Sequence, residues 1–139
     1  MKKTFEIAKE IDISCNSWFA KKPLYVKEED ERYKEYSEQL KERGFCDSET
    51  WNFGYEVICF SLPRLKRFRE IHNGYPHGMT ADEWVAILDK MIFAMEWALQ
   101  QDRMDDGYED LSSEDKAERW KKYEEGMSLF SKHLLCLWW

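Results

Sequence analysis

Apolar and polar positions recur with a helical period along much of the chain, most clearly between residues 50 and 101. Steps of three and four place apolar side chains on one side of a helix. In 50–72 that face holds Trp51, Tyr55, Ile58, Leu62 and Leu65. In 80–101 it holds Trp84, Ile87, Leu88, Met91, Ile92, Met95, Ala98 and Leu99. The pattern predicts two central helices.

Start and stop signals sharpen the bounds of these two helices. Thr80 and Glu83 have capping-box spacing, in which each side chain satisfies a backbone N–H of the other. Asn73 and Gly74 favour a left-handed termination of the first helix. Pro63 lies within the first pattern, and we expect a kink or a new helix there because proline removes a backbone donor.

Both central helices also carry apolar side chains away from the main face. These are Phe53, Val57 and Phe60 in the first helix, and Phe93 and Trp97 in the second. A helix that is apolar on two faces is either packed between other helices or offers one face to a partner. The sequence leaves both alternatives open.

Two further helices flank the central pair. Residues 27–43 are highly charged, with a thin apolar line of Tyr33, Tyr36 and Leu40, and Gly44 is expected to end this helix. A last helix begins near Ser112 or Ser113 and leads to Trp138 and Trp139. We expect at least one of these terminal tryptophans to be buried, because exposing both to water is unfavourable.

Together these segments predict an all-α fold. We expect a single domain over residues 1–139, a compact bundle of about four to five helices. Residues 1–25 are expected to form an N-terminal arm and residues 102–112 an acidic loop. A chain of 139 residues is long enough to bury a stable core without a disulfide or a metal.

The charge balance limits the class of partner. The formal net charge is −7, with a sequence pI near 5.1. A general nucleic-acid binder needs a basic surface, so direct nucleic-acid binding is not expected. An acidic surface serves plain solubility, or it docks on a basic surface of another protein.

The sequence favours a reducing, cytoplasmic location. No apolar run is long enough to span a bilayer, and the basic start, MKKTFEIAKEIDIS, lacks the continuous apolar core of a signal peptide. No membrane association is therefore expected. The four cysteines lack a CxxC or other metal-like spacing, and they are expected to be free thiols.

Reactive chemistry is not indicated. The three histidines lack the spacing of zinc or di-iron sites, and no Gly-rich phosphate loop occurs. The acidic loop partly matches a calcium loop at Asp102, Asp106 and Gly107, but Met104 and Ser113 stand where oxygen ligands are needed. We therefore predict a protein that is not an enzyme and has no catalytic residues, cofactor or metal.

A basic cluster interrupts the acidic sequence at Arg64, Lys66, Arg67 and Arg69. On a helix these four side chains point in several directions and do not form one patch. Pairing with acidic segments is therefore favoured over a phosphate or nucleic-acid site.

Several motifs resemble a family of small proteins from phages and prophages of Gram-positive bacteria. The blocks are L-P-R-L-K-R-F at 62–68, G-Y-P at 74–76 and E-W-x-x-I-L-D-x-M at 83–91. Gly44-Phe45 with Thr50-Trp51, and Glu125-Gly126 with Leu129-Phe130, extend the likeness over most of 44–138. The family has no established activity, so the resemblance implies no active-site residue.

The resemblance and the acidic composition together suggest a small phage-type accessory protein that acts by protein–protein binding. An inhibitor of a host defence nuclease, similar to anti-CRISPR proteins, fits this profile. The alternative is a structural or assembly protein of a phage that self-associates as a homo-oligomer. The candidate partner-binding residues are aromatic anchors and nearby carboxylates: Phe93, Trp97, Tyr108, Asp105, Asp106, Glu109 and Asp110.

Overall fold

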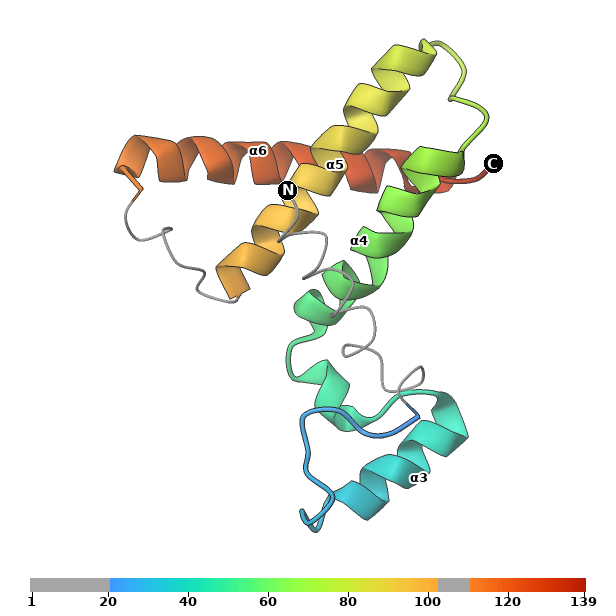
Figure 1. Cartoon of the computed structure of the whole chain (residues 1–139), viewed down its shortest axis with the longest axis vertical. Coiled ribbons are helices and arrows are strands. Elements are labelled where there is room, and N and C mark those ends of the chain that lie inside the picture. The colour runs from blue at the N-terminus through green and yellow to red at the C-terminus, as the bar shows by residue number, and fades with distance from the viewer. Residues whose placement is uncertain (1–20, 103–110) are drawn as a thin grey trace. The chain divides into compact units, whose positions relative to one another are not determined.

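The computed structural model describes residues 21–102 and 111–139, and these residues form helices and turns (Figure 1). The predicted all-α class is confirmed. The α-helices are α3 (Tyr33–Arg43), α4 (Phe53–Ile71), α5 (Ala81–Asp102) and α6 (Ser113–His133). Two short 3-10 helices are η1 (Asp47–Thr50) and η2 (Leu134–Cys136).

The chain divides into two compact units, unit 1 (Met1–Pro63) and unit 2 (Arg64–Trp139). Helix α4 contributes its first half to unit 1 and its second half to unit 2. The expectation of one domain over 1–139 stays a prediction.

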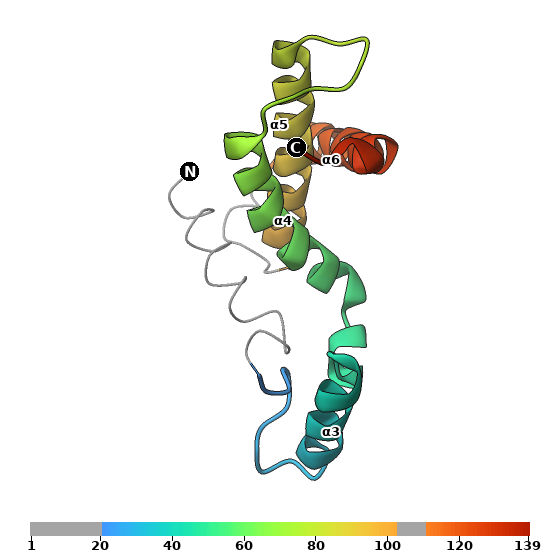
Figure 2. The same ribbon diagram turned by 90° about the vertical axis from the view of Figure 1, so that its right-hand side faces the viewer.

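Unit 2 is built on the crossing of α5 and α6. The two helices cross at a steep angle, as two perpendicular views show (Figures 1 and 2). Gly126 of α6 is buried, and a Cβ atom there would overlap the carbonyl oxygen of Lys90 and the Cβ of Ala94. The backbones therefore approach more closely than any larger residue at position 126 allows. Lys90 and Glu125 add an ion pair beside this crossing, with 2.7 Å from Nζ to Oε1.

The apolar face of α5 forms the core of unit 2. Its buried side chains follow the predicted period: Trp84, Leu88, Met91, Met95 and Leu99. Ala94 and Trp97 are buried as well, which widens the buried face beyond the predicted stripe. A helix buried on more than one side needs neighbours on more than one side. The sandwiched alternative therefore holds for this part of α5.

Side-chain caps define the start of α5 and α6. Glu83 Oε2 accepts a hydrogen bond from the Thr80 N–H at 2.7 Å, and Thr80 Oγ1 accepts from the Glu83 N–H at 3.2 Å. The predicted capping box is therefore confirmed. At α6, Ser112 Oγ accepts from the Asp115 N–H at 3.1 Å. Both caps satisfy amides that the first helical turn leaves without a partner.

The basic cluster is largely paired with acidic residues. Lys66 Nζ lies 2.7 Å from Glu96 Oε1, and Arg69 forms a bidentate pair with Asp89, so both pairs join the second half of α4 to α5. Arg67 pairs with Glu70 one turn later on the same helix. The favoured reading of the cluster, local pairing, is confirmed for Lys66, Arg67 and Arg69.

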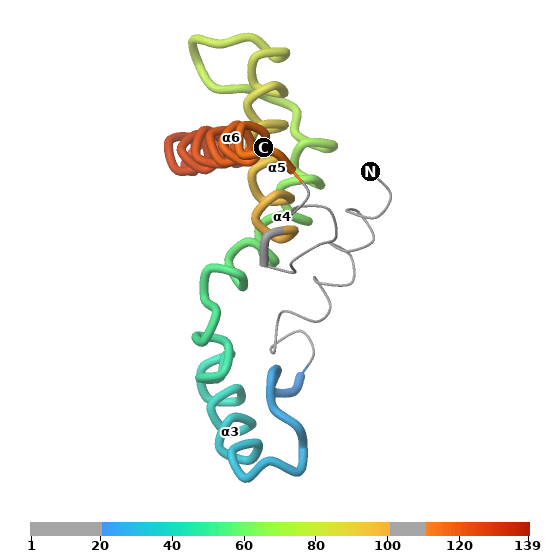
Figure 3. The backbone as a smooth tube through the Cα atoms, turned by 90° about the vertical axis from the view of Figure 1, so that its left-hand side faces the viewer, coloured from blue at the N-terminus to red at the C-terminus, as the bar shows by residue number. Residues whose placement is uncertain are grey.

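Unit 1 contains α3, which begins at Tyr33 and not at residue 27 as expected. Residues 27–32 form turns instead, which can be followed in Figure 3. The reason lies in Asp30, whose carboxylate accepts a hydrogen bond from the Arg32 N–H at 2.9 Å. Such a local side-chain bond stabilises a turn in place of a helix. Gly44 ends α3 in the left-handed conformation with φ 80°, as predicted.

Helix α4 differs from its prediction at its start. It begins at Phe53, because η1 and a turn at Trp51 and Asn52 precede it. Ile58, Leu62 and Leu65 are buried as the stripe predicted, but Trp51 is 83% exposed. The placement of Trp51 in the core was therefore wrong. The helix continues through Pro63, and no new helix begins there.

The segment after α6 corrects the expectation that at least one terminal tryptophan is buried. Trp138 and Trp139 are both exposed, as are Leu134 and Leu135. The chain leaves α6 through η2, and that short helix buries none of its residues. No helix within the described ranges is both long enough and apolar enough to cross a membrane.

Candidate functional site

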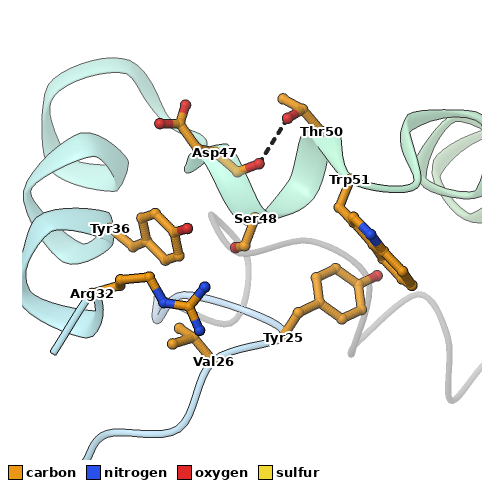
Figure 4. Close-up of a pocket in the computed structure, with 8 residues that line it drawn as sticks. All are labelled: Tyr25, Val26, Arg32, Tyr36, Asp47, Ser48, Thr50 and Trp51. Atoms are coloured by element: carbon orange, nitrogen blue, oxygen red, sulfur yellow. Dashed lines mark hydrogen bonds between the residues drawn. The ribbon is translucent and has the colours of Figure 1, made fainter. Parts of the chain in front are cut away.

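A pocket of about 510 Å³ lies in unit 1 (Figure 4). It is formed by the segment before the turns, the start of α3, η1 and the residue after η1. Among the described residues, its lining consists of Tyr25, Val26, Arg32, Tyr36, Asp47, Ser48, Thr50 and Trp51. Its volume falls in the range of pockets that hold small molecules or single side chains of a partner, about 300–1,000 Å³.

Aromatic rings form much of the pocket wall. Trp51 and Tyr25 are exposed, and Figure 4 shows both rings at the same end of the pocket. Tyr25 has a left-handed backbone with φ 63°, which is uncommon for a bulky residue and costs about 1 kcal/mol or more. Its hydroxyl donates a hydrogen bond to Glu56 Oε1 of α4. Backbone and hydroxyl together fix the direction of this ring.

A guanidinium group points into the pocket from the start of α3. Arg32 donates from Nε to Asp30 Oδ1 at 2.9 Å and from Nη2 to Asp30 Oδ2 at 2.7 Å. These two bonds lower the pKa of Asp30 to about 2 and raise the pKa of Arg32. The end of the Arg32 side chain is directed toward Ser48 and Tyr25 (Figure 4). Asp30 therefore orients Arg32 and offsets its charge.

Asp47 is the acidic member of the lining, and it is also paired. Its carboxylate accepts hydrogen bonds from Arg43 and from Gln39 Nε2, the latter at 2.8 Å. These bonds lower its pKa, the Arg43 bond more than the Gln39 bond. Gln39 also accepts from the Asp47 N–H at 2.9 Å, which ties η1 to α3. Both charges of the lining thus have a partner of opposite sign.

The hydroxyl groups of the lining hold its loops in place. Ser48 Oγ donates to the Leu24 carbonyl at 2.7 Å, and Thr50 Oγ1 donates to the Asp47 carbonyl at 2.7 Å (Figure 4). Because these hydrogens are used within the chain, neither hydroxyl is arranged beside a base as a nucleophile would be. The arrangement is suited to binding.

Beneath Tyr25, the carboxyl of Glu56 is partly buried. Burial raises its pKa, and the hydrogen bond from Tyr25 acts in the opposite direction with a smaller effect. Glu56 is therefore the acceptor that positions the Tyr25 ring. Its burial disfavours the ionised form of the carboxyl.

The first half of α4 carries an exposed apolar face. Phe53, Val57 and Phe60 recur at steps of four and three, so they lie on one side of the helix. All three are exposed, Phe53 to 68%. We call these three residues the α4 apolar face. Together with Trp51 they form a run of large exposed hydrophobic side chains within ten residues of sequence.

The two aromatic anchors expected on α5 have different environments. Phe93 is 38% exposed, and Lys122 Nζ lies 5.8 Å from its ring centre. Trp97 is only 4% exposed, and its ring packs on Trp120 and Tyr123 of α6 with centroid distances of 5.5 and 5.1 Å. Trp97 is therefore corrected from a surface anchor to a residue of the α5–α6 core. Its position opposite the main stripe is explained by α6 packing there.

The other predicted partner-binding residues, Tyr108, Asp105, Asp106, Glu109 and Asp110, lie outside the described residues. The same holds for most of the partial calcium loop. Among residues 21–102 and 111–139, no group of three or more His, Cys, Asp or Glu side chains is arranged to hold a metal ion. His133 is buried and packs edge-on against Trp84, with 5.6 Å between ring centres.

Sequence reasoning did not identify the pocket. Tyr25 was assigned to the N-terminal arm, Tyr36 to the thin line of α3 and Trp51 to the core stripe of α4. One signal was present: Asp47-Ser48-Glu49-Thr50 is rich in turn and cap residues, which favours an earlier, separate turn before α4. That turn moves Trp51 off the helix and into the pocket wall.

Comparisons with protein-family models, with curated proteins and with solved structures gave no match. The resemblance to small phage and prophage proteins thus stays a prediction.

Proposed function

We propose that this protein acts by binding another protein, with unit 1 as the contact surface. The observation that carries the proposal is the run of exposed hydrophobic side chains formed by Trp51 and the α4 apolar face. Large contiguous apolar surface is uncommon on a protein that works alone. Aromatic side chains also supply most of the energy of protein interfaces when a partner excludes water from them.

Charge suggests the character of the partner surface. The chain has a net charge of −7, and the turns before α3 carry exposed carboxylates at Glu28, Glu29 and Glu31. A basic partner surface would be attracted over a distance of about 10 Å at moderate salt, which raises the association rate. The apolar contact would then determine how long the complex lasts.

This binding mode fits a small acidic accessory protein of phage type, and we propose inhibition of a host defence nuclease, as anti-CRISPR proteins do, as its outcome. The support is the resemblance of the motifs at 62–68, 74–76 and 83–91 together with the acidic charge. A nuclease presents a basic surface to its nucleic acid, and an acidic protein that covers this surface would block it.

The test is an affinity pull-down from a lysate of a Gram-positive host, at low and moderate salt, followed by a cleavage assay with the captured nuclease. A double variant, Phe53→Ala with Phe60→Ala, should abolish capture and inhibition. Tyr75→Ala, which removes an exposed aromatic ring from unit 2, is the matched control and should retain both. Inhibition that survives in the double variant contradicts the proposal.

Self-association is the second candidate, and a specific observation favours it. The described chain has another exposed apolar segment in unit 2, at Leu134, Leu135, Trp138 and Trp139. A chain with two apolar surfaces can form head-to-tail assemblies of a structural protein. Sedimentation velocity over a range of concentrations distinguishes the two candidates. A mass that rises with concentration, and that falls to the monomer on Leu135→Ser, supports assembly.

A further inference from the structure

The hydrogen-bonding groups of the unit 1 pocket are unequally available. The hydroxyls of Tyr25, Ser48 and Thr50 donate their hydrogens within the chain. The Arg32 guanidinium lines the pocket (Figure 4), and its bonds to Asp30 use Nε and Nη2 but not Nη1. The Tyr36 hydroxyl and the Trp51 indole N–H form no hydrogen bond with another described residue. The pocket therefore offers donors, and a ligand rich in acceptors satisfies them.

The electrostatic balance favours a ligand group without charge. An anion that approached Arg32 would also meet the Asp30 carboxylate, which already binds that guanidinium. It would further meet Asp47 of the lining and the exposed Glu31, which precedes Arg32 in the chain. A cation placed in the pocket would meet Arg32 itself. Backbone carbonyl groups supply acceptor oxygens without a net charge, which suits these surroundings.

The shape of the wall favours a flat, rigid apolar group beside those carbonyls. Tyr25, Tyr36 and Trp51 provide aromatic surface, and Val26 adds an aliphatic contact. Proline rings pack well on aromatic side chains, and a polyproline II segment is extended before it binds, so it loses little entropy. Its carbonyls have no internal hydrogen-bond partner, and proline has no N–H that would need an acceptor.

We infer that the pocket formed by Tyr25, Arg32, Tyr36 and Trp51 binds a proline-containing extended segment of the partner protein. This inference rests on the proposed function and specifies the partner's chemistry. Glu28, Glu29 and Glu31 lie just before Arg32 in the chain and are exposed, so a basic residue that flanks the prolines would be favoured.

The test uses three fluorescein-labelled synthetic peptides and measures anisotropy on the full chain. The first alternates proline and leucine and ends in arginine. The second replaces each proline with alanine, and the third carries phosphotyrosine between acidic residues. The first peptide should bind, and the second should bind at least about tenfold more weakly, because the flexible chain must be ordered and its amides lose water.

Two substitutions assign the binding to the pocket. Trp51→Ala should weaken the first peptide by at least about tenfold, as for a central aromatic contact. Tyr36→Phe removes one donor and should weaken it by about two- to tenfold. Tyr75→Ala, in unit 2 and outside the pocket lining, is the control and should change affinity by less than about twofold. Trp51 is 83% exposed, so its loss should leave the fold intact, which circular dichroism verifies.

Three results would overturn the inference: no binding of the proline peptide, equal binding of the alanine peptide, or tighter binding of the phosphotyrosine peptide. An equal effect of Trp51→Ala and Tyr75→Ala would also overturn it, because the contact would then not be specific to the pocket. The proposed function fails separately. If Trp51→Ala abolishes peptide binding while partner capture and inhibition persist, only the pocket inference is lost.

Discussion

Units 1 and 2 are held together by different kinds of contact. In unit 2, α5 buries most of its large side chains, and a glycine lets α6 approach it backbone to backbone. In unit 1, α3 buries none of its residues, and the loops around the pocket are held by hydrogen bonds of Ser48, Asp47 and Tyr25. Helix packing therefore dominates in unit 2, whereas polar contacts hold the pocket segments of unit 1.

The largest expected difference in stability effect comes from substituting one large aromatic residue in each unit. Trp84→Ala removes a buried side chain and should destabilise unit 2 by about 3–5 kcal/mol. Phe60→Ala removes an exposed one and should change stability by no more than about 0.5 kcal/mol. Urea denaturation followed by circular dichroism measures both. Equal costs would show that the α4 apolar face is part of a core.

The helix crossing in unit 2 provides the next largest effect. Gly126→Ala forces a methyl group against the Lys90 carbonyl and Ala94, so α5 and α6 must separate, at a cost of about 1–3 kcal/mol.

Gly54 of α4 is the matched control for this change, because a Cβ there has nothing within 4 Å. Gly54→Ala should stabilise the protein by about 0.5–1 kcal/mol through its better helix propensity. Thermal unfolding of the two variants measures these stability changes, which should have opposite signs. A stable Gly126→Ala protein would contradict the close crossing.

Substitutions in the cap of α5 should have a smaller effect on the stability of unit 2. Thr80→Ala removes the acceptor for the Glu83 N–H and should cost about 1 kcal/mol. Thr80→Ser keeps a hydroxyl in the same place and should cost clearly less. Hydrogen exchange of the first turn of α5 reports the change locally. Equal exchange in both variants would mean that the cap contributes nothing to this end of the helix.

The smallest effect concerns Glu56 in unit 1, and it depends on pH. Burial raises its pKa above 4.5 in the folded chain, so the folded state binds a proton more readily than the unfolded state. The contribution of Glu56 protonation to the free energy of unfolding therefore increases as pH falls through the raised pKa toward 4.5. Glu56→Gln keeps an acceptor for Tyr25 and removes the charge, so it should slightly stabilise unit 1 at pH 7 and weaken this pH dependence.

Asp30 and Asp47 provide the contrasting trend for the same experiment. Their pKa values are lowered, that of Asp30 to about 2, by hydrogen bonds from Arg32 and Arg43 respectively. The stability that these two carboxylates contribute is complete above about pH 3.8 and is lost as pH falls below that value. A stability profile of Glu56→Gln that keeps the full wild-type dependence above pH 4.5 would exclude Glu56 as its source.

The sequence predicted unit 2 better than unit 1, for a physical reason. Helix α5 combines a capping box with a long apolar period, and local signals of this kind act without distant residues. The two alternatives for Trp97 stayed open because burial on its side depends on α6, which lies more than a dozen residues later in the chain. A period within one helix holds no information about a second neighbour.

The pocket was beyond such reasoning because it is assembled from short segments. The left-handed backbone at Tyr25 and the Asp30 bond to the Arg32 amide each depend on a few polar contacts. Neither produces a hydrophobic period. Trp51 illustrates the result, since its spacing to Tyr55 matches a helix although α4 begins only at Phe53.

Gly126 also determines the rotational phase of α6. A turn of the helix by one residue would bring Glu125 or Met127 against the Lys90 carbonyl, where even a methyl group does not fit. A single hydrogen atom in place of a side chain therefore selects which residues of α6 face solvent. In a saturation-mutagenesis library we expect position 126 to reject every other amino acid, while its immediate neighbours accept many.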